Sequence, residues 1–437
     1  MKQNPNTSIF KSLRQTNKKE SYLIGYSFVY FFCLLCSYFI LRPLRDEMGI
    51  VNGAINMQWL FTGTFVAMLC IVPLFSVLVS RNSIKKTLLF SYTFFITNII
   101  LFYVLFEMFG TSRVLAISFF IWLSVFNLFV VSLFWSFMAD VFSSKSSKRF
   151  FGIIASGGSL GALTGPLIAN YLSTQFSISV LLVVAASFLT LALLCILCIL
   201  KLSDKRAYFN KRTQTKTIST AILFEAIKNI SKSRYLMGIA AFVLLYTTIS
   251  TVLYFEQAHI VEETLVKSKA RIRYFSSIDF KVNAIAIIGQ LFFTGRIIKK
   301  SGLPLVLASI PCIMGIGLIA LGVSPTLSII ALLMVIHRAG NFMLLRPGKE
   351  ILFTVSSLED KYKSKNLIDT AIYRGGDALI GWFFAGFITM GWGLGAIAFL
   401  AIPMAFLWSF IGYDLGKQHL KKEKCLTLND TMYENNV

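Results

Sequence analysis

The stretch ISVLLVVAASFLTLALLCILCIL, Ile178–Leu200, contains no charged residue. At a rise of ~1.5 Å per residue, a helix of this length crosses the ~30 Å hydrocarbon core of a lipid bilayer. Hydrocarbon offers no hydrogen-bond partners, so the backbone of a single spanning segment has to bond to itself as an α-helix. The stretch therefore predicts a transmembrane helix, and apolar runs of similar length recur along the chain.

The composition excludes an ordinary soluble protein. Hydrophobic residues make up 56% of the 437-residue chain and charged residues 14%, whereas soluble domains are ~25% charged. The formal net charge is +22, but the lysines and arginines lie between the apolar runs, which is typical of cytoplasmic loops rather than of nucleic-acid binding. No phosphate-binding loop, zinc-ligand spacing or nucleophile elbow occurs in the sequence. We therefore expect no enzyme activity, no cofactor, no metal site and no nucleic-acid partner.

Twelve runs are predicted to span the membrane, six in each half of the chain. The first six lie near Tyr22–Leu41, Met57–Val79, Thr87–Phe106, Val114–Ala139, Phe151–Tyr171 and Ile178–Leu200. The second six lie near Tyr235–Phe255, Ser277–Ile298, Leu303–Leu321, Thr326–Phe353, Leu367–Met390 and Leu394–Tyr413. The predicted organisation is an N-terminal tail at 1–21, a six-helix bundle at 22–200, a basic linker at 201–234, a second six-helix bundle at 235–413 and a C-terminal tail at 414–437.

The basic residues set the predicted orientation. Alternate connections are rich in lysine and arginine, as at 81–86, 145–149, 296–300 and 361–365, whereas those at 322–325 and 391–393 contain neither. Basic loops stay on the cytoplasmic side, so both termini and the central linker are predicted to be cytoplasmic, and the expected location is a bacterial inner membrane. One connection departs from this rule, because four basic residues fall on the predicted outer side. They are Lys267, Lys269, Arg271 and Arg273.

The two halves of the chain show weak internal similarity. The segment FVVSLFWSFMADVFSS, Phe129–Ser144, aligns with FMLLRPGKEILFTVSS, Phe342–Ser357. Parallel six-helix repeats joined by a basic cytoplasmic linker are typical of major facilitator transporters. We therefore predict an all-α membrane protein of major facilitator-like architecture.

A few charged residues remain inside the predicted spans. They are the cations Lys281, Arg338, Arg346 and Arg374, the acids Asp279, Asp369 and Asp377, and, near the cytoplasmic end of the tenth span, Lys349 and Glu350. Each costs ~2.5–3.5 kcal/mol on insertion scales, so an ion inside the membrane marks a functional site by default. The simpler alternative is that these ions pair with one another and hold the helices together.

Two of these positions carry specific expectations. Asp279 and Lys281 are close enough in sequence to share a polar environment, as a structural or a coupling pair. Arg338 has no acid within one helical turn, so its partner is expected on another helix or in a ligand. The adjacent His337 is interpreted first as a hydrogen-bonded packing residue.

Two further patterns concern helix ends and helix contacts. Arg42 and Arg45 are three residues apart at the end of the first span, so both guanidinium groups can face one side and bind a phosphate or carboxylate. The alternative is a solvated helix end in which Pro43 introduces a kink. The glycines at 157, 161 and 165 are four apart and predict a smooth stripe for close helix packing.

Three segments resemble the ATP/ADP translocases, the nucleotide (NTP/NDP) exchange family of plastids and obligate intracellular bacteria. They are YFILRPLRDEM (Tyr38–Met48), FWSFMADVFSSKSSKRFFGIIASGGSLGALTGP (Phe134–Pro166) and RPGKEILFTVSSLEDKYKSKNLIDTAIYRGGDALIGW (Arg346–Trp382). The resemblance runs over most of the chain and implies a major facilitator-like fold and nucleotide exchange. It implies substrate-binding or gating roles at the positions that match the family pattern, namely Arg42, Arg45, Asp46, Pro347, Lys349, Glu350, Lys363, Lys365, Asp369 and Arg374.

One position departs from that family. The exchangers carry a lysine three residues after the arginine that matches Arg374, whereas this sequence has Asp377. Adding an acid and removing a base changes the local charge by two units, which disfavours a tri- or diphosphate there. Asp377 is expected to pair with Arg374 or to bind a transported cation such as a proton.

These patterns lead to three hypotheses about function. The first is a secondary transporter of a small anionic metabolite, with nucleotide exchange by alternating access as the leading case and the lipid bilayer as its surroundings. The second is a proton-coupled exporter of a small organic molecule, because Gly161–Pro166 resembles an antiporter motif and Asp377 would carry the proton. The third is a non-transporting receptor or assembly factor, which the lack of a sizeable soluble segment disfavours.

Overall fold

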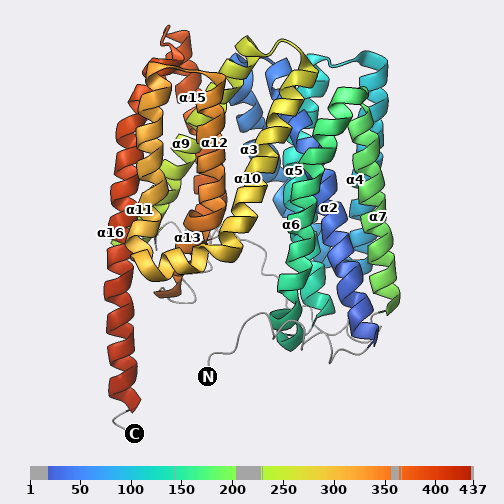
Figure 1. Cartoon of the computed structure of the whole chain (residues 1–437). Helices are drawn as coiled ribbons and strands as arrows, with labels where there is room; N and C mark the ends of the chain where they lie inside the picture. Colours follow the sequence, from blue (N-terminus) through green and yellow to red (C-terminus); the bar gives the residue numbers. More distant parts are fainter. Residues whose placement is uncertain are drawn as a thin grey trace. The chain divides into compact units, whose positions relative to one another are not determined.

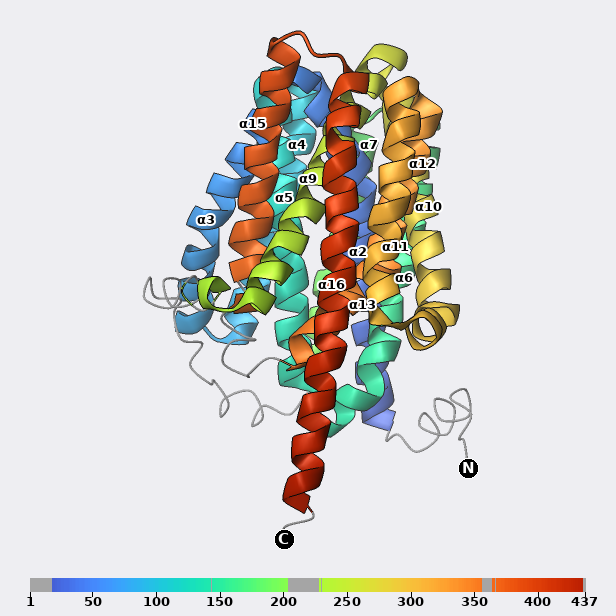
Figure 2. The ribbon, with the colours of Figure 1, turned by 90° about the vertical axis from the view of Figure 1, so that its left-hand side faces the viewer.

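Figure 1 and Figure 2 show the computed structural model, which describes residues 18–142, 144–202, 228, 230–355, 364–365 and 367–434. All regular elements within these ranges are helices. The predicted all-α class is therefore confirmed for the part of the chain that the structure describes.

The helices follow the predicted spans in order. The first half contains α2 (Lys18–Val51), η1 (Ala54–Asn56), α3 (Met57–Arg81), α4 (Ile84–Phe109), α5 (Arg113–Val141), α6 (Ser144–Gln175) and α7 (Val180–Leu202). The second half contains α9 (Arg234–Thr264), α10 (Ser268–Phe292), α11 (Thr294–Val323), α12 (Leu327–Gly340), η2 (Asn341–Leu345), α13 (Arg346–Leu352), η3 (Phe353–Val355), η4 (Ile368–Ile372), α15 (Tyr373–Thr389) and α16 (Leu394–Glu434).

Length and hydropathy support a membrane-spanning role for these helices. Within the described residues, 11 helical segments are long and apolar enough to cross a bilayer. The remaining predicted span corresponds to α15, which has 17 residues and continues directly from the π-helical turn η4. Every predicted span thus has a helix at its position.

Local sequence explains where several helices begin. Ser83, Ser112 and Ser233 immediately precede α4, α5 and α9, and each side-chain oxygen accepts a hydrogen bond from the backbone N–H three residues later. Such N-caps satisfy one of the amide groups that the first helical turn leaves without a partner. These short polar caps separate one apolar helix from the next.

Contacts divide the chain into two compact units. The first unit contains α2, most of α3, α4 to α7 and the start of α10, and the second contains η1, the start of α3, α9, the rest of α10 and the later helices. The change of unit falls between Val66 and Ala67 in α3 and between Phe280 and Lys281 in α10. Each unit therefore combines helices from both halves of the sequence.

In the first unit α2 is the central helix, packed against α5, α6 and α7. The glycine stripe of α6 faces it directly. A Cβ atom at Gly161 would overlap the carbonyl oxygen of Phe32, and one at Gly157 would overlap that of Phe28. The predicted packing role of this stripe is confirmed, because only a missing side chain lets the two backbones approach so closely.

In the second unit α11 and α16 run side by side, and α9 packs against α16, α15 and α12 (Figure 1). Gly412 and Gly416 of α16 meet the backbone of α11 at Leu307 and Pro304. The buried rings of Phe242 and Trp408 join α9 to α16, with centroids 5.7 Å apart. Small residues and stacked aromatic rings thus hold this unit together.

Several helices extend beyond the predicted spans, α10 and α16 among them. α10 begins at Ser268 rather than near Ser277, so Lys269, Arg271 and Arg273 belong to a helix and not to an outer loop. α16 continues to Glu434, through most of the predicted C-terminal tail (Figure 2). Both differences arise because polar helical turns extend beyond the apolar segment that hydropathy detects.

The close contact between α2 and α6 leads to a stability prediction. Gly161→Ala adds a methyl group against the α2 backbone, so we expect the free energy of unfolding to fall by ~1–3 kcal/mol. The measurement is thermal unfolding of the purified protein in detergent. Gly152→Ala is the matched control, since nothing lies within 4 Å of a Cβ there, and equal stability of the two variants would contradict the packing role.

Candidate functional site

The deep charges of the second unit gather around two irregular turns. The π-helical turn η2 interrupts the tenth span directly before Arg346, and the π-helical turn η4 ends two residues before Arg374. Such π-turns break the regular backbone ladder and occur frequently at functional sites. The candidate site consists of Tyr246 and Thr251 of α9, Asn341 of η2, Arg346 of α13, and Tyr373, Arg374 and Asp377 of α15. We call it the α9–α12–α15 cluster, because η2 and α13 continue directly from α12.

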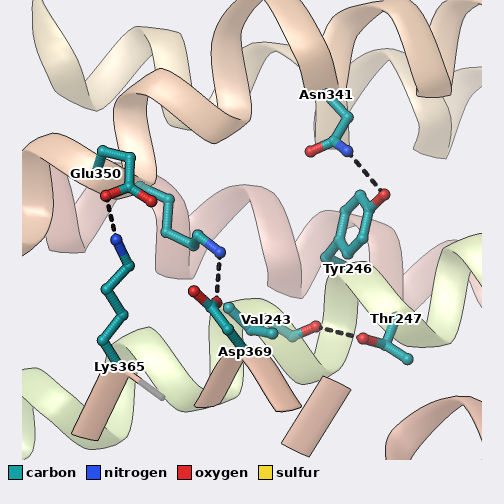
Figure 3. Close-up of polar contacts among 8 residues, drawn as sticks. Val243, Tyr246, Thr247, Asn341, Glu350, Lys365 and Asp369 are labelled. Atoms are coloured by element: carbon teal, nitrogen blue, oxygen red, sulfur yellow. Dashed lines mark hydrogen bonds and ion pairs between the residues drawn. The ribbon is translucent and has the colours of Figure 1, made fainter. Parts of the chain in front are cut away.

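An aromatic and amide group forms one side of this cluster. Asn341 donates a hydrogen bond from Nδ2 to the hydroxyl of Tyr246 at 2.9 Å (Figure 3). The Tyr246 ring stacks on His337, with centroids 5.2 Å apart, and lies 5.9 Å from the ring of Tyr373. His337 is buried and also faces Trp408, which agrees with the packing part of its interpretation. The expected hydrogen bond is not found at its Nε2, which has no partner among the described residues.

Asp377 has two partners. Its Oδ1 accepts a hydrogen bond from the hydroxyl of Thr251 at 2.9 Å, and its Oδ2 lies 3.7 Å from Nη1 of Arg374. The carboxylate is largely buried, whereas the Arg374 side chain is 41% exposed and lies over the Tyr373 ring. Arg374 therefore keeps part of its guanidinium group available to another anion.

The cations near the end of the tenth span are paired more tightly. Nζ of Lys349 lies 2.6 Å from Oδ1 of Asp369, and Nζ of Lys365 donates to Oε2 of Glu350 (Figure 3). The guanidinium group of Arg346 lies 4.6 Å from the centre of the Phe342 ring, a cation–π contact. Lys363 lies outside the described residues.

Arg338 occupies the last turn of α12, beside the buried His337, and its side chain is half-buried. From the sequence, the partner of Arg338 was predicted to be on another helix or in a ligand. The structure places Arg338 in the second unit together with Arg374, while Arg42 and Arg45 belong to the first unit.

The first unit holds a separate set of ion pairs at the end of α2 and the start of α10. Nη1 of Arg42 lies 3.3 Å from Oδ1 of Asp279, whose side chain is 1% exposed. Arg45 bonds the adjacent Asp46 at 2.6 Å. We call these pairs, together with Arg271 and Glu47, the α2–α10 cluster.

The structure changes the partner suggested for Asp279. Lys281 is exposed, and two residues along a helix turn the side chains ~200° apart. Asp279 pairs instead with Arg42, which lies far away in the sequence. The structural role considered for Asp279 with Lys281 therefore moves to Asp279 with Arg42.

Sequence reasoning did not identify Glu47 and Arg271 as partners. Nη1 of Arg271 lies 3.6 Å from Oε1 of the buried Glu47. The available signal was the excess of basic residues on the predicted outer side, because a cation there needs an acid. Thr251 and Tyr246 carry no charge and gave no comparable signal.

The geometry limits the chemistry of the α9–α12–α15 cluster. Within the described residues, no group of three or more metal-binding side chains is close enough to hold a metal ion. The cluster offers guanidinium groups, an amide and aromatic rings, which bind anions and planar groups without bond-making chemistry. This arrangement suits recognition of a polar solute within a membrane protein.

Comparison with known proteins agrees with this picture. Residues 23–348 match the sequence model of the family described as Major Facilitator Superfamily. No curated protein sequence matches the chain.

Three solved structures illustrate the similarity of fold. A bacterial homologue of the human lysosomal transporter Spinster is 14% identical, with 93% of this chain and 99% of that chain covered and a TM-score of 0.62. The nucleoside transporter NupG is 14% identical, with 93% and 100% covered and a TM-score of 0.60. The human organic anion transporter MFSD10 is 14% identical, with 91% and 100% covered and a TM-score of 0.58. Identities this low demonstrate a shared fold only.

The buried Arg42–Asp279 pair leads to a second prediction. Asp279→Asn removes the carboxylate that faces Arg42, and breaking one side of a buried pair costs ~3–5 kcal/mol. We expect a lower unfolding temperature in detergent for Asp279→Asn, and partial recovery in the double variant with Arg42→Gln. Lys269→Gln is the control, because this exposed lysine lies on the same helix. A double variant less stable than Asp279→Asn would show that the pair does not act as a unit.

Proposed function

The chain belongs to the major facilitator superfamily of secondary transporters, and we propose that it carries an anionic metabolite, with nucleotides as the first substrate class. The family match excludes the alternative of a non-transporting receptor or assembly factor. The observation that carries the proposal is the exposure and loose pairing of Arg374. Its side chain is partly exposed, and its Nη1 lies 3.7 Å from Oδ2 of Asp377, a long distance for an ion pair.

The charge balance around Arg374 favours an anion. In the segments 338–350 and 365–377, five cations stand against three acids, namely Arg338, Arg346, Lys349, Lys365 and Arg374 against Glu350, Asp369 and Asp377. A planar guanidinium fork binds two oxygens of a phosphate or carboxylate at once. Because Arg374 is partly exposed, it can turn from Asp377 toward a substrate anion, while Thr251 still donates a hydrogen bond to the carboxylate.

The aromatic residues of the α9–α12–α15 cluster favour a nucleotide among anions. Tyr246 and Tyr373 lie beside the cations, and a tyrosine ring provides a surface on which a base can stack. Asn341 adds an amide that can pair with a base edge. A Cβ at Gly375, the neighbour of Arg374 in the sequence, would meet only the ring of Phe65, at 3.8 Å, so this glycine leaves open space on its own face of α15.

The resemblance to the ATP/ADP translocases supports the same class. It concerns Arg42, Arg45 and Asp46 in the α2–α10 cluster, and Lys349, Glu350, Asp369 and Arg374 in the second unit. We propose gating by the first set, since its charges already neutralise one another, and substrate binding by the second. The protein would then act in a bacterial inner membrane, with both termini in the cytoplasm.

A proton-coupled exporter of a small organic molecule is the second candidate. The observation that favours it is the burial of Asp377 among Thr251 and Arg374. A carboxyl group in such a place would carry a proton if Arg374 moved away. Comparison of two transport modes in one variant separates the two candidates.

The proposed role of Arg374 predicts the effect of its removal. We expect Arg374→Gln to reduce nucleotide uptake into proteoliposomes at least about tenfold, which corresponds to about 1.4 kcal/mol of lost binding. Arg374→Lys should restore only part of it, because an ammonium group cannot make a planar two-point contact. Arg296→Gln serves as control, since Arg296 is an exposed residue of α11. Full uptake by Arg374→Gln would remove this residue from the site.

The pair that Asp377 forms predicts a different result. Asp377→Asn leaves Arg374 without its acid, so we expect both driven uptake and counterflow exchange to fall by similar factors, about fivefold. Selective loss of uptake driven by a pH gradient would instead favour the proton-coupled exporter, because counterflow needs no net proton movement. Unchanged rates in both modes would exclude Asp377 from either role.

A further inference from the structure

α9 carries a carboxyl group that the clusters above do not use. Glu256 is fully buried, and neither of its carboxylate oxygens has a hydrogen-bond partner among the described residues. Two other acids of this unit do have donors. Asp377 accepts from Thr251, and Glu262 accepts the backbone N–H of Ala54 at 3.0 Å.

The helices around α9 bring no charge to the level of Glu256. α15 runs parallel to α9, because Thr251 bonds Asp377 while Phe255, further along α9, packs against Phe384, further along α15, with centroids 5.2 Å apart. Beyond Asp377, the rest of α15 contains no charged residue.

The other helices packed against α9 agree. α3 meets α9 at Phe61, whose ring packs against Phe255, and residues 57–66 of α3 carry no charge. α16 meets α9 at Trp408, and its preceding residues, 394–407, carry no charge. α12 meets α9 at His337, which stacks on Tyr246, and its preceding residues, 327–336, carry no charge either. The short helix η1, which also packs against α9, is uncharged.

The titratable and charged groups that face this part of α9 are few. His259 lies one turn further along the same helix, and its Nδ1 is bonded to the carbonyl oxygen of Phe255. Arg374 and Asp377 lie at the level of Thr251 and are paired with each other. Asp369 of η4 is paired with Lys349.

An ionised carboxylate in such a place would lose its hydration without gaining a donor, which costs several kcal/mol. A protonated carboxyl group avoids that cost and gains an O–H donor. It can then bond a backbone carbonyl of the preceding turn, as the hydroxyl of Thr247 does to Val243 at 2.9 Å on the same helix (Figure 3).

We propose that Glu256 is a proton-binding site, neutral in the conformation described here. The proton leaves to water as the carboxyl becomes a carboxylate, when movement of α9 against its neighbours brings water or a cation to this side chain. No oxidation or other bond change is involved. The coupling of this proton to transport rests on the proposed function, whereas the protonated state of Glu256 does not.

The two buried acids Asp377 and Glu256 lie in different surroundings and have different roles. Asp377 faces Thr251 and Arg374, which stabilise its ionised form. Glu256 faces neither a donor nor a cation. The proton therefore belongs to Glu256, and Asp377 remains the counter-ion of Arg374.

Infrared spectroscopy tests the protonated state directly. The purified full chain at pH 7 should show the carbonyl stretch of a protonated carboxylic acid in an apolar environment, and Glu256→Gln should lose that band. Glu262→Gln is the matched control and should keep it, because Glu262 lies on the same helix but accepts a backbone N–H. A band that persists in Glu256→Gln would overturn the proposal, as would saturable binding of radioactive sodium that only Glu256→Gln abolishes.

A measurement on the unmodified chain covers the case in which Glu256→Gln does not fold. Dicyclohexylcarbodiimide adds to protonated buried carboxyl groups: the carboxyl oxygen attacks the central carbon, the proton moves to nitrogen, and no atom leaves. Peptide mass analysis should locate the adduct on Glu256. Adducts on other acids with Glu256 unmodified would contradict the assignment.

Transport assays then test the coupling. In proteoliposomes, Glu256→Gln should lose at least about tenfold of the nucleotide uptake driven by a pH gradient, while counterflow exchange stays within about twofold of the wild type. If Glu256→Gln lost driven uptake and counterflow exchange by the same factor, or lost neither, coupling through Glu256 would be overturned. Absence of nucleotide transport by the wild type would defeat the proposed function alone, because the infrared band decides the proton site independently.

Discussion

The absence of water from the bilayer core is the constraint on which the rest of this structure depends. It requires every spanning backbone to form a helix and every deep charge to find a partner or lose its charge. Asp279 meets Arg42, Lys349 meets Asp369 and Arg374 meets Asp377. Glu256 meets the same requirement in another way, by holding a proton instead of a partner.

The same constraint explains how the helices associate. Lipid tails are as apolar as leucine, so helices in a membrane gain little from hydrophobic burial against one another and depend on close van der Waals contact. Gly161 of α6 supplies such contact at α2, and Gly416 of α16 supplies it at α11. Both glycines place backbone against backbone, which keeps the helix surfaces smooth where they touch.

Hydropathy made the spans predictable, because a membrane helix has to be apolar over its whole crossing. It did not predict the start of α10, since Arg271 looks like a loop residue until Glu47 is placed opposite it. Ion-pair partners were equally hard to predict. Asp279 has Lys281 nearby in sequence, but helical geometry turns that lysine away and the fold brings Arg42 from α2. The Arg374–Asp377 pair was predictable, because both residues lie three apart on one helix and the interaction is local.

The strength of each pair bears on what a carrier can do with it. A site that bound its substrate with bare cations would leave unpaired charge in hydrocarbon whenever the substrate departed. Lys349–Asp369, at 2.6 Å, is a closed pair between α13 and η4. Arg374–Asp377, at 3.7 Å and with the Arg374 side chain 41% exposed, is a more open one. In the anion carrier that we propose, Asp377 would compensate the arginine while the site is empty and would release it when a substrate anion arrives. The aspartate that departs from the translocase pattern would then serve as the resting partner of an exchangeable cation rather than abolish anion binding.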